Sequence, residues 1–460
     1  MPALIERRQR ARYIAIETTD AAHLAATRRK LTAPQRRSLA QQGFTAAAGM
    51  FALLHDPRGT LDSVLVGVDA RQPLAALAGL AHTLPPGTYC LADAGVLADR
   101  RAAALGWALG AYRYTRYRAV KREPATLAIP VPDLDVLRPQ LDATFLVRDL
   151  VNTPTADLGP EELSAAVKAV GRAHHANTRE WVGEGLLKAN FPTIHAVGRA
   201  SHRPPRLVQL QWGKANHPKL VLVGKGVCFD SGGLDLKSAG GMRWMKKDMG
   251  GAAHALALAQ LVMQADLPVR LTLLVPTVEN SVSGSALRPG DVVKTRAGLQ
   301  VEIDNTDAEG RLILCDALAY ASEQQPDLIV DFATLTGAAR VALGPDLPAL
   351  FANRDEVAQA VLAAGLEVND PLWRLPLWQP YRQMLDSYLA DFTNSGGAGH
   401  AGAITAALYL ERFVDPAGAW VHLDTYAWND RARPGRPQGG EAMGLRALFA
   451  YLRQRYRRGA

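Results

Sequence analysis

The central part of the chain alternates short, continuous apolar runs with stretches of helical spacing. Residues 219–224, 270–275 and 328–332 are apolar runs of strand length, while residues 252–265 and 312–323 repeat apolar side chains with a helical period. A run that is apolar on both faces is typical of a strand covered by helices on both sides of its sheet. Strands that alternate with helices pair in parallel through crossover connections. We therefore predict an α/β fold with a mixed, largely parallel sheet flanked by helices.

A separate domain is predicted to precede this region. An apolar run at 63–68 predicts a buried strand, and prolines punctuate residues 124–139 before a helical stretch at 141–150. The sequence Asn152-Thr153-Pro154 then interrupts that helical pattern. We place the boundary near this point and predict a smaller N-terminal α/β domain over 1–145 and a larger C-terminal domain over 146–460.

The composition excludes several classes of protein. Of the 460 residues, 48% are hydrophobic and 21% are charged, which is the ordinary globular range and argues against extensive disorder. No apolar run approaches the roughly 18 to 20 residues that a membrane-spanning helix needs, and residues 1–8 lack the apolar core of a secretory signal. Three cysteines fit free thiols in a reducing compartment better than a disulfide framework. We expect a soluble, cytoplasmic protein without a membrane partner.

The formal net charge of +8 is distributed unevenly along the chain. Residues 1–150 carry 20 basic and 13 acidic side chains, residues 431–460 carry 8 and 1, and residues 225–311 carry 10 of each sign. A basic surface can attract nucleic acid. Here the basic surplus lies at the two ends of the chain, and the region densest in charges of both signs is neutral.

The first segment with candidate chemistry follows the predicted strand at 219–224. Lys225 comes directly after that strand, and Asp230 precedes the pair Gly232-Gly233. Ligands of open α/β sheets bind at the carboxyl ends of the strands, where both side chains would lie. The alternative is a Lys–Asp pair on a surface loop. The glycines fit neither a P-loop nor a dinucleotide-binding fingerprint.

The second segment carries Lys237 and, just before the predicted helix at 252–265, Asp248. At that position, an aspartate is expected to cap the helix N-terminus, and metal binding is the alternative. Lys237, taken alone, is a loop lysine. We expect the neighbouring Lys246 and Lys247 to be solvated charges beside the site and not part of it.

The third segment is the acidic stretch at residues 304–312. In an extended backbone, Asp307, Glu309 and Arg311 would project to one side, and two carboxylates so close together need a cation to neutralise them. The alternative is a solvated acidic turn that leads into a helix after Arg311, with Glu309 favourable at its N-terminus. For this stretch, we favour a metal site.

Together, these segments supply hard oxygen ligands and a lysine that could bind metal when neutral. The four carboxylates of Asp230, Asp248, Asp307 and Glu309 exceed what one divalent ion needs and suit two ions roughly 3.5 to 4 Å apart. Zinc motifs such as HExxH or CxxC are absent from the sequence. Lys225 could ligate a metal once burial beside cations lowers its pKa. Lys237 and Arg311 remain as fixed positive charges.

These motifs resemble those of the leucine (cytosol) aminopeptidase family. Residues 305–312 (Asn-Thr-Asp-Ala-Glu-Gly-Arg-Leu) look like the signature octapeptide of that family, and residues 223–233 look like its lysine-containing metal segment. Residues 245–252, 333–338 and 402–407 supply further matches. The matches occur in order over about residues 145–445. The N-terminal 140 residues match only in length and character.

The resemblance implies a di-metal leucyl aminopeptidase, a hydrolase that releases N-terminal amino acids from peptides with a free N-terminus. It implies a catalytic C-terminal domain, an N-terminal domain with an oligomeric or regulatory role, and a homohexamer of two stacked trimers. It also implies two divalent metal ions per subunit, for which Mn or Zn, and also Mg or Co, suit the ligands. The implied metal ligands are Lys225, Asp230, Asp248 and Glu309 for one ion, and Asp230, Asp307 and Glu309 for the other.

The same resemblance implies the mechanism. A water that bridges the metals would attack the first peptide carbonyl. Arg311 would hold a bicarbonate ion as the general base, and Lys237 would stabilise the oxyanion, a contact typically worth about 2.7 to 4 kcal/mol. The implied substrate pocket is lined by Met245, Asn305, Thr334, Gly337 and Tyr426.

One departure concerns this pocket. Tyr426 and Trp428 follow His422-Leu423-Asp424, where the family often has small residues, so a simple leucine preference is in doubt. The alternative for both aromatic rings is ordinary core packing.

Two other functions are alternatives to, or additions to, the aminopeptidase function: DNA binding and phosphate-ester hydrolysis. Some members of the family also act as architectural DNA-binding proteins, and the arginines of residues 1–150 motivate an additional role of that kind. A metal-dependent phosphatase would share carboxylate-bridged ions. It would also need phosphate-contacting groups that residues 305–312 do not supply.

Overall fold

The computed structural model describes residues 3–8, 12–92, 95–397 and 399–457. The chain divides into two compact units, Met1–Phe145 with Asp430–Gln438, and Leu146–Asn429 with Gly439–Ala460. The segment around residues 430–438 therefore belongs to the first unit although it follows most of the second along the chain. Among the described residues, no helix combines the length and the apolar character needed to cross a bilayer.

The first unit contains a six-stranded sheet, in which all neighbouring strands are parallel except the β3–β4 pair. The apolar run predicted at 63–68 lies in β4, which is buried along most of its length. Trp107 and Tyr89 are fully buried in its core. In sheet order the strands are β1 (Leu4–Glu6), β6 (Thr126–Ile129), β5 (Thr88–Leu91), β2 (Ile14–Thr19), β4 (Leu61–Gly67) and β3 (Phe51–His55). The helices are α1 (Leu24–Lys30), α2 (Ala33–Gln41), α3 (Pro73–Ala76) and α4 (Arg100–Ala111).

The helix predicted at 141–150 is longer than expected. It begins within the proline-punctuated stretch and forms α5 (Val131–Asn152), with Pro139 inside it. Pro132 is tolerated because the first turn of a helix has amides without intrahelical partners. The boundary between the two units falls within this helix.

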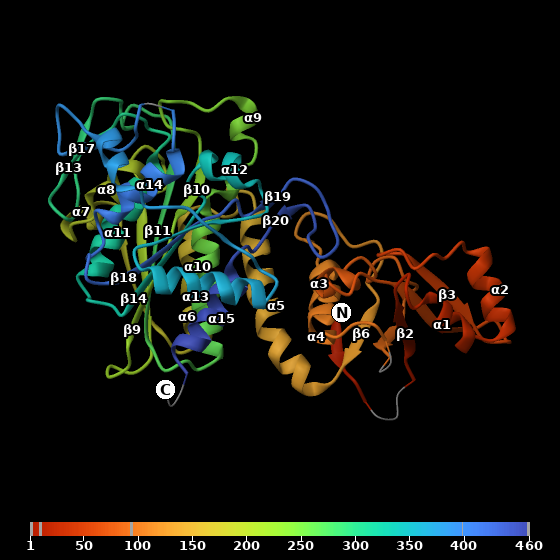
Figure 1. Ribbon diagram of the computed structural model, residues 1–460. Helices are drawn as coiled ribbons and strands as arrows, with labels where there is room; N and C mark the ends of the chain where they lie inside the picture. Colours follow the sequence, from red (N-terminus) through yellow and green to blue (C-terminus); the bar gives the residue numbers. More distant parts are fainter. Residues whose placement is uncertain (1–2, 9–11, 93–94, 398, 458–460) are drawn as a thin grey trace. The chain divides into compact units, whose positions relative to one another are not determined.

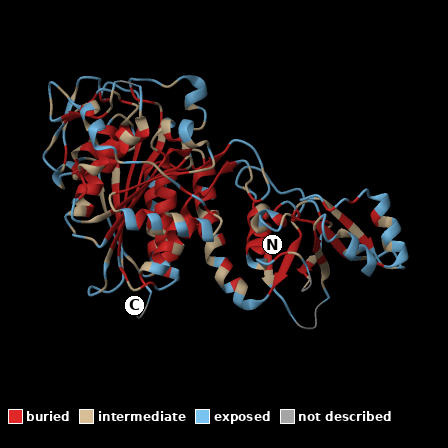
Figure 2. Ribbon diagram, viewed as in Figure 1, coloured by how far each residue is buried: buried red, intermediate tan, exposed pale blue. Residues whose placement is uncertain are grey.

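The second unit is built on a nine-stranded mixed sheet (Figure 1). Its centre is parallel, as predicted: β18, β14, β9 and β11 pair in that order, and β10 pairs with β11 in parallel. Antiparallel strands β8, β7 and β15 extend the two sides. The strands are β7 (Asn177–Val182), β8 (Arg206–Trp212), β9 (Lys219–Gly224), β10 (Gly226–Asp230), β11 (Arg270–Asn280), β14 (Leu328–Ala333), β15 (Ala349–Ala352), β16 (Trp373–Arg374) and β18 (Ala419–Asp424). Figure 2 shows that the central strands are buried.

Helices cover both faces of this sheet. On one face, α10 contacts α6 and α15, and α13 contacts α15; on the other, α11 contacts α8 and α14. The helices are α6 (Pro160–Ala173), α7 (Glu184–Lys188), α8 (Pro192–Gly198), α9 (Ala239–Met242), η1 (Met245–Met249), α10 (Gly250–Gln264), α11 (Glu309–Ser322), α12 (Gly337–Leu343), α13 (Asp355–Glu367), η2 (Gln379–Leu385), α14 (Gly402–Glu411) and α15 (Leu445–Arg455). Short strands complete the unit: β12 (Val292–Lys294), β13 (Gln300–Glu302), β17 (Phe392–Thr393), β19 (Trp428–Asn429) and β20 (Gly439–Gly440).

The alternation of side chains along β9 determines which face each residue reaches. Val221 and Val223 belong to the core cluster that contains α11. Gly224 lies so close to α10 that a Cβ would stand 2.6 Å from the Cα of Ala252. Because side chains of a strand alternate between faces, the next residue, Lys225, continues toward α11. β9 therefore places the Lys225 side chain beside the first turn of α11.

Candidate metal centre

A cavity of about 600 Å³ opens at the carboxyl edge of the parallel strands. Lys225 follows β9, Asp230 ends β10, Thr334 follows β14 and Asp424 ends β18, and all four line it. This is the edge where open α/β sheets bind ligands. The cavity is also lined by residues of the loops and short helices that follow these strands, among them Lys237, Met245, Lys247, Asp248, Asn305, Asp307, Arg311, Gly337, Arg340 and Tyr426.

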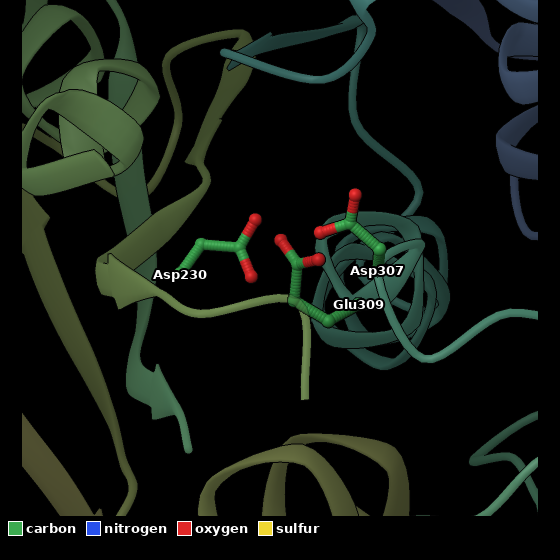
Figure 3. Close-up of side chains that lie close together, drawn as sticks. All are labelled: Asp230, Asp307 and Glu309. Atoms are coloured by element: carbon green, nitrogen blue, oxygen red, sulfur yellow. The ribbon is translucent and has the colours of Figure 1, made fainter. Parts of the chain in front are cut away.

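Three carboxylates converge beside this cavity. Asp230, Asp307 and Glu309 each offer one oxygen, and these oxygens lie within 4.8 Å of one another. Figure 3 shows the three side chains turned toward a common space, with Asp230 approaching from β10, Asp307 from the turn before α11 and Glu309 from the start of that helix. Glu309 is 1% exposed. Such a group of oxygen atoms is the donor set that hard divalent cations prefer.

The backbone at the third segment differs from the extended conformation considered above. Residues 305–308 form a turn, and α11 begins at Glu309, three residues earlier than the alternative had it. Glu309 is therefore in the first helical turn, where the helix dipole favours a negative charge. Asp307 and Glu309 still converge because the turn places Asp307 next to the helix N-terminus, which the extended-strand argument did not anticipate.

Lys225 joins two of the acidic segments. Its Nζ lies 2.7 Å from a carboxylate oxygen of Asp248 and 3.0 Å from one of Glu309, and it donates a hydrogen bond to the Thr334 carbonyl oxygen at 2.9 Å. Gly310 makes room for this side chain, because a Cβ there would stand 2.6 Å from the Lys225 Cε. A glycine inside a helix costs about 0.5 to 1 kcal/mol relative to alanine. At this position, it allows the lysine to reach the carboxylates.

Asp248 does not cap the following helix, so the expectation that it caps the helix N-terminus was wrong. It lies in the 3-10 helix η1, Met249 occupies the N-cap of α10, and no side chain caps that end. The Asp248 Oδ1 instead accepts a hydrogen bond from the Thr334 hydroxyl at 2.8 Å. Its carboxylate is thereby held at the carboxyl edge of β14, facing Lys225.

Lys237 bridges the other carboxylates. Its Nζ lies 2.7 Å from an Asp230 oxygen and also contacts Asp307. A hydrogen bond from the Lys237 amide to the Ser231 carbonyl oxygen, at 3.0 Å, closes the loop formed by residues 231–237. Gly232, at φ +90°, occupies the tight turn, where a Cβ would overlap the Asp235 carbonyl oxygen.

The neighbouring carboxylates of this cluster repel one another, which changes their pKa values. Burial and the neighbouring Asp230 raise the pKa of Glu309 well above its usual range, and the same two causes raise the pKa of Asp307 to about 6. Burial alone would lower the pKa of Lys225, but the carboxylates of Asp248, Glu309 and Asp230 raise it instead. Apart from the ion pair with Lys225, neither Glu309 oxygen has a hydrogen-bonding partner among the described residues. Buried carboxylates with unused lone pairs and mutual repulsion fit divalent cations.

Arg311 lies two residues into α11 and is 8% exposed. It lines the same cavity as Lys237 and donates a hydrogen bond to the Asn394 carbonyl oxygen at 2.7 Å. Its Nε has no hydrogen-bond partner among the described residues. The guanidinium therefore retains donors for an anion in the cavity.

Two family models match most of the chain. Residues 145–449 match the catalytic domain of the cytosol aminopeptidase family, and residues 14–130 match the N-terminal domain of M17 aminopeptidases. The chain belongs to the cytosol aminopeptidase family. The resemblance found in the motifs is thus confirmed, and so is the α/β fold class. Members of this family are hydrolases of the metallo-exopeptidase class, so this chain is an aminopeptidase that acts on peptides.

Individual relatives agree with this assignment. A probable cytosol aminopeptidase of Syntrophotalea carbinolica is 40% identical over 76% of this chain and 74% of its own length. The crystal structure of a cytosol aminopeptidase from Coxiella burnetii superposes with a TM-score of 0.96, at 48% identity, over 99% of this chain and 100% of that one. The bottromycin maturation enzyme BotP, solved in complex with Mn, has a TM-score of 0.87 at 35% identity, over 97% of this chain and 100% of BotP.

Asn394 holds the acidic turn of this aminopeptidase in place, and the sequence motifs did not reveal it. Its side-chain oxygen accepts the amides of Asp304 at 2.9 Å and Asn305 at 3.2 Å, and its Nδ2 donates to the Asn305 carbonyl oxygen at 2.8 Å. The side chain is fully buried. Because its partners lie about 90 residues away, no local pattern indicates its role.

A second pair of interactions ties the two loops of the carboxylate cluster together. The Asp235 carboxylate accepts the Thr306 amide at 2.7 Å, and the Thr306 hydroxyl accepts the Asp235 amide at 2.8 Å. Asn280, at the end of β11, donates through Nδ2 to Asp230 at 2.9 Å and to the Thr306 carbonyl oxygen at 3.1 Å. Groups that orient metal ligands in this way commonly change metal affinity by about 10- to 100-fold.

The residues predicted to line a substrate pocket lie around the same cavity. Met245, Asn305, Thr334, Gly337 and Tyr426 all line it. Trp428 does not line it and is instead buried against Trp244, with ring centres 4.9 Å apart, so core packing describes that ring.

The expectation for Lys247 was wrong. Lys247 is 6% exposed and lines the cavity, whereas Lys246 is half-buried and donates to the Asn152 carbonyl oxygen at 2.5 Å. The two lysines diverge because successive residues of the 3-10 helix η1 point in different directions. Burial lowers the pKa of Lys247 to about 8.

Proposed function

We propose that the chain releases N-terminal amino acids from peptides by a hydrolysis that depends on two divalent metal ions. The observation that carries this proposal is the convergence of the Asp230, Asp307 and Glu309 oxygens within 4.8 Å beside a cavity of about 600 Å³. The cavity is also lined by Lys237 and Arg311, two cations of the kind that stabilise developing negative charge or hold an anion.

The ligands divide into two sets that share members. Lys225, Asp230, Asp248 and Glu309 would hold one ion, and Asp230, Asp307 and Glu309 would hold the other. Ligation by Lys225 requires a neutral amine, whereas its carboxylate neighbours raise its pKa and favour the protonated form. Binding at the first position would therefore release a proton. Mn and Zn are the ions proposed first, and support for Mn comes from BotP, which was solved in complex with Mn.

Bound ions would polarise the scissile carbonyl and supply a water nucleophile at neutral pH. Lys237 would then donate to the carbonyl oxygen as negative charge develops on it. Lys237 Nζ contacts Asp230 and Asp307, and ions that neutralise these carboxylates would free the amine for the substrate. Arg311 would hold a bicarbonate ion as general base, using the donors that the Asn394 carbonyl leaves free.

The proposed substrate pocket is framed by Met245, Asn305, Thr334, Gly337 and Tyr426. Gly337 begins α12 and leaves open space where a Cβ would lie, which gives a substrate side chain room there. The peptide's free amine would be the group that distinguishes substrates.

We also propose that the chain works as a homohexamer in the cytoplasm, with residues 1–145 as an oligomeric or regulatory domain and residues 146–460 as the catalytic domain. Large exposed aromatic side chains gather in one segment, Trp373, Trp378 and Tyr388 being 59%, 55% and 95% exposed. Exposed apolar surface of this kind marks interaction sites. The location follows from the names of the relatives, which are cytosol aminopeptidases. No observation favours the DNA-binding role, and it is not proposed.

Metal removal tests this function directly. Exhaustive chelation should abolish hydrolysis of leucine amide, and added Mn²⁺ or Zn²⁺ should restore it. N-acetylated leucine amide should not be cleaved under either condition, because the substrate amine is blocked. Activity that persists in the chelated protein, with metal content verified as negligible, would overturn the two-metal proposal.

A further inference from the structure

Two cations flank one aromatic ring in the cavity. The Nζ of Lys247 lies 4.8 Å from the centre of the Tyr426 ring, and the guanidinium carbon of Arg340 lies 4.9 Å from the same centre. All three side chains line the cavity that contains the proposed metal ligands. Lys247 comes from η1 and Arg340 from α12, so two separate elements deliver a positive charge to one place.

Neither cation has an acidic partner in the described part of the chain. No hydrogen bond or ion pair connects the Lys247 amine or the Arg340 guanidinium to another described residue, although Lys247 is only 6% exposed. The Lys247 amine faces the cavity, and its contact with the ring restores only part of the hydration that this largely buried side chain has lost. The two cations are thus available to an anion that enters the cavity.

The nearest carboxylates that line the cavity are already engaged. Asp424 accepts the amide of Leu335 at 2.9 Å and the hydroxyl of Thr336 at 2.6 Å. Asp248 accepts the Thr334 hydroxyl and faces Lys225. These two carboxylates attract Lys247 electrostatically, but among the described residues neither forms an ion pair with Lys247 or Arg340.

We propose that this part of the cavity binds the side-chain carboxylate of the first residue of the substrate, so that the enzyme prefers N-terminal aspartate or glutamate. This inference rests on the proposed function, because it takes the amine and the first carbonyl of the peptide to lie at the metal centre. The first side chain is then the substrate group that reaches toward Met245, Thr334, Gly337 and Tyr426.

The physical basis is the difference between a charged and an apolar occupant. A carboxylate can accept charge-assisted hydrogen bonds from Lys247 and Arg340, which are stronger than bonds between neutral groups. A leucine side chain would instead cover an ammonium group that has no partner, which penalises the apolar substrate. The Tyr426 ring would form the side of this subsite and hold both cations in place.

The test compares isosteric substrates with the metal-loaded enzyme. Glutamate and glutamine p-nitroanilides have the same shape and no C-terminal carboxylate, so only the side-chain charge differs between them. We expect kcat/KM for the glutamate substrate to exceed that for the glutamine substrate at least tenfold. In Lys247→Met and in Arg340→Met, this ratio should fall at least fivefold.

Matched variants separate the charge from other effects. Lys246→Met removes a lysine adjacent in sequence whose amine bonds to Asn152 away from the cavity lining, and it should keep the ratio of the unaltered enzyme. Lys247→Arg retains the positive charge and should keep most of the preference. Arg340 is exposed, so its replacement is tolerated by the fold even where Lys247→Met is not.

The outcomes distinguish this inference from the proposed function. Equal use of glutamate and glutamine by the metal-loaded enzyme, or a ratio unaffected by both Lys247→Met and Arg340→Met, would overturn the acidic preference. If leucine p-nitroanilide is cleaved in the same experiment, the aminopeptidase function stands in either case. If no aminoacyl substrate is cleaved in the presence of Mn²⁺ or Zn²⁺, the proposed function fails first.

Discussion

Asp235 and Thr306 exchange two hydrogen bonds, with the Asp235 carboxylate accepting the Thr306 amide at 2.7 Å and the Thr306 hydroxyl accepting the Asp235 amide at 2.8 Å. The two residues are 71 positions apart along the chain. One belongs to the loop that carries Asp230 and Lys237, and the other to the turn that carries Asp307. The geometry of the carboxylate cluster therefore depends on this contact between loops.

Replacing Asp235 with alanine should weaken metal binding about 10-fold, in line with other groups that orient metal ligands. The loop that carries Asp230 and the turn that carries Asp307 would no longer be held in their relative positions, although the metal ligands themselves would be unchanged. Titration of Mn²⁺ by calorimetry gives the affinity. Asp304→Ala removes an equal charge from an exposed side chain nearby and should bind metal normally; equal losses in both variants would show that charge alone matters.

Gly310→Ala should separate function from stability. A Cβ at this position would stand 2.6 Å from the Lys225 Cε and 2.7 Å from its Nζ, so the amine must move away from Asp248 and Glu309. Alanine favours helix over glycine by about 1 kcal/mol, which should offset much of the strain. We expect at least a 10-fold loss of activity with thermal stability nearly unchanged. Gly185→Ala, in α7 with open space around it, is the control that should retain activity.

Lys237→Met should retain both metals and lose turnover. Removal of an oxyanion-stabilising donor typically costs about 100- to 1000-fold in kcat. Metal binding should not suffer, because the amine leaves Asp230 and Asp307 more negative when it is removed. Metal content, measured by atomic emission, and kcat together test whether the variant keeps its metals and loses turnover. Turnover near that of an exposed-lysine variant such as Lys214→Met would mean that Lys237 has a structural role only.

The buried ion pair of Arg148 and Glu441 should be sensitive to the loss of one partner. Arg148 donates from Nη2 to both Glu441 carboxylate oxygens, at 3.0 and 3.1 Å. The Arg148 side chain is 1% exposed and that of Glu441 is 4% exposed. Arg148→Leu leaves a buried carboxylate without its cation and should destabilise the fold by about 3 to 5 kcal/mol. Urea denaturation measures this. Adding Glu441→Leu should restore much of the stability, and the exposed Arg172→Leu should change it by no more than about 0.5 kcal/mol.

Stability in acid should depend on Asp327. Burial alone would raise its pKa, but hydrogen bonds from Arg455 at 3.0 Å and Tyr456 at 2.5 Å hold it below the ordinary aspartate value. A carboxyl whose pKa is lower in the folded state stabilises the fold above its unfolded pKa, and this contribution is lost as the pH falls through the folded pKa.

Asp327→Asn should therefore reduce stability at pH 7 by about 1 kcal/mol, a value kept small because the side chain is partly exposed. The difference from the unaltered protein should shrink below about pH 4, where the aspartate itself becomes protonated. Thermal unfolding between pH 3 and pH 7 tests this. A difference that is constant over the whole range would contradict it, and Asp304→Asn serves as the exposed control.

Much of the architecture follows from local patterns. The run at 219–224 coincides with β9 because six apolar or boundary residues without a polar face suit a strand covered on both sides. The alternation of such runs with helices also indicated the parallel centre of the sheet. Local patterns were weaker at element ends: Gly250 and Gly251 lie inside α10, where Gly251 lets the helix approach the backbone of β14.

The sequence by itself determined the types of chemical group available and the strands whose ends carry them. Lys225, Asp230 and the 305–312 octapeptide could be singled out because each follows or ends a recognisable element. The tertiary structure alone decided which side chains meet: Asn394 on the acidic turn, Asp235 on Thr306, and Lys247 beside Arg340 and Tyr426. The reason is physical, since propensity and periodicity act over a few residues, whereas these contacts join segments about 70 to 180 positions apart through packing of the whole sheet.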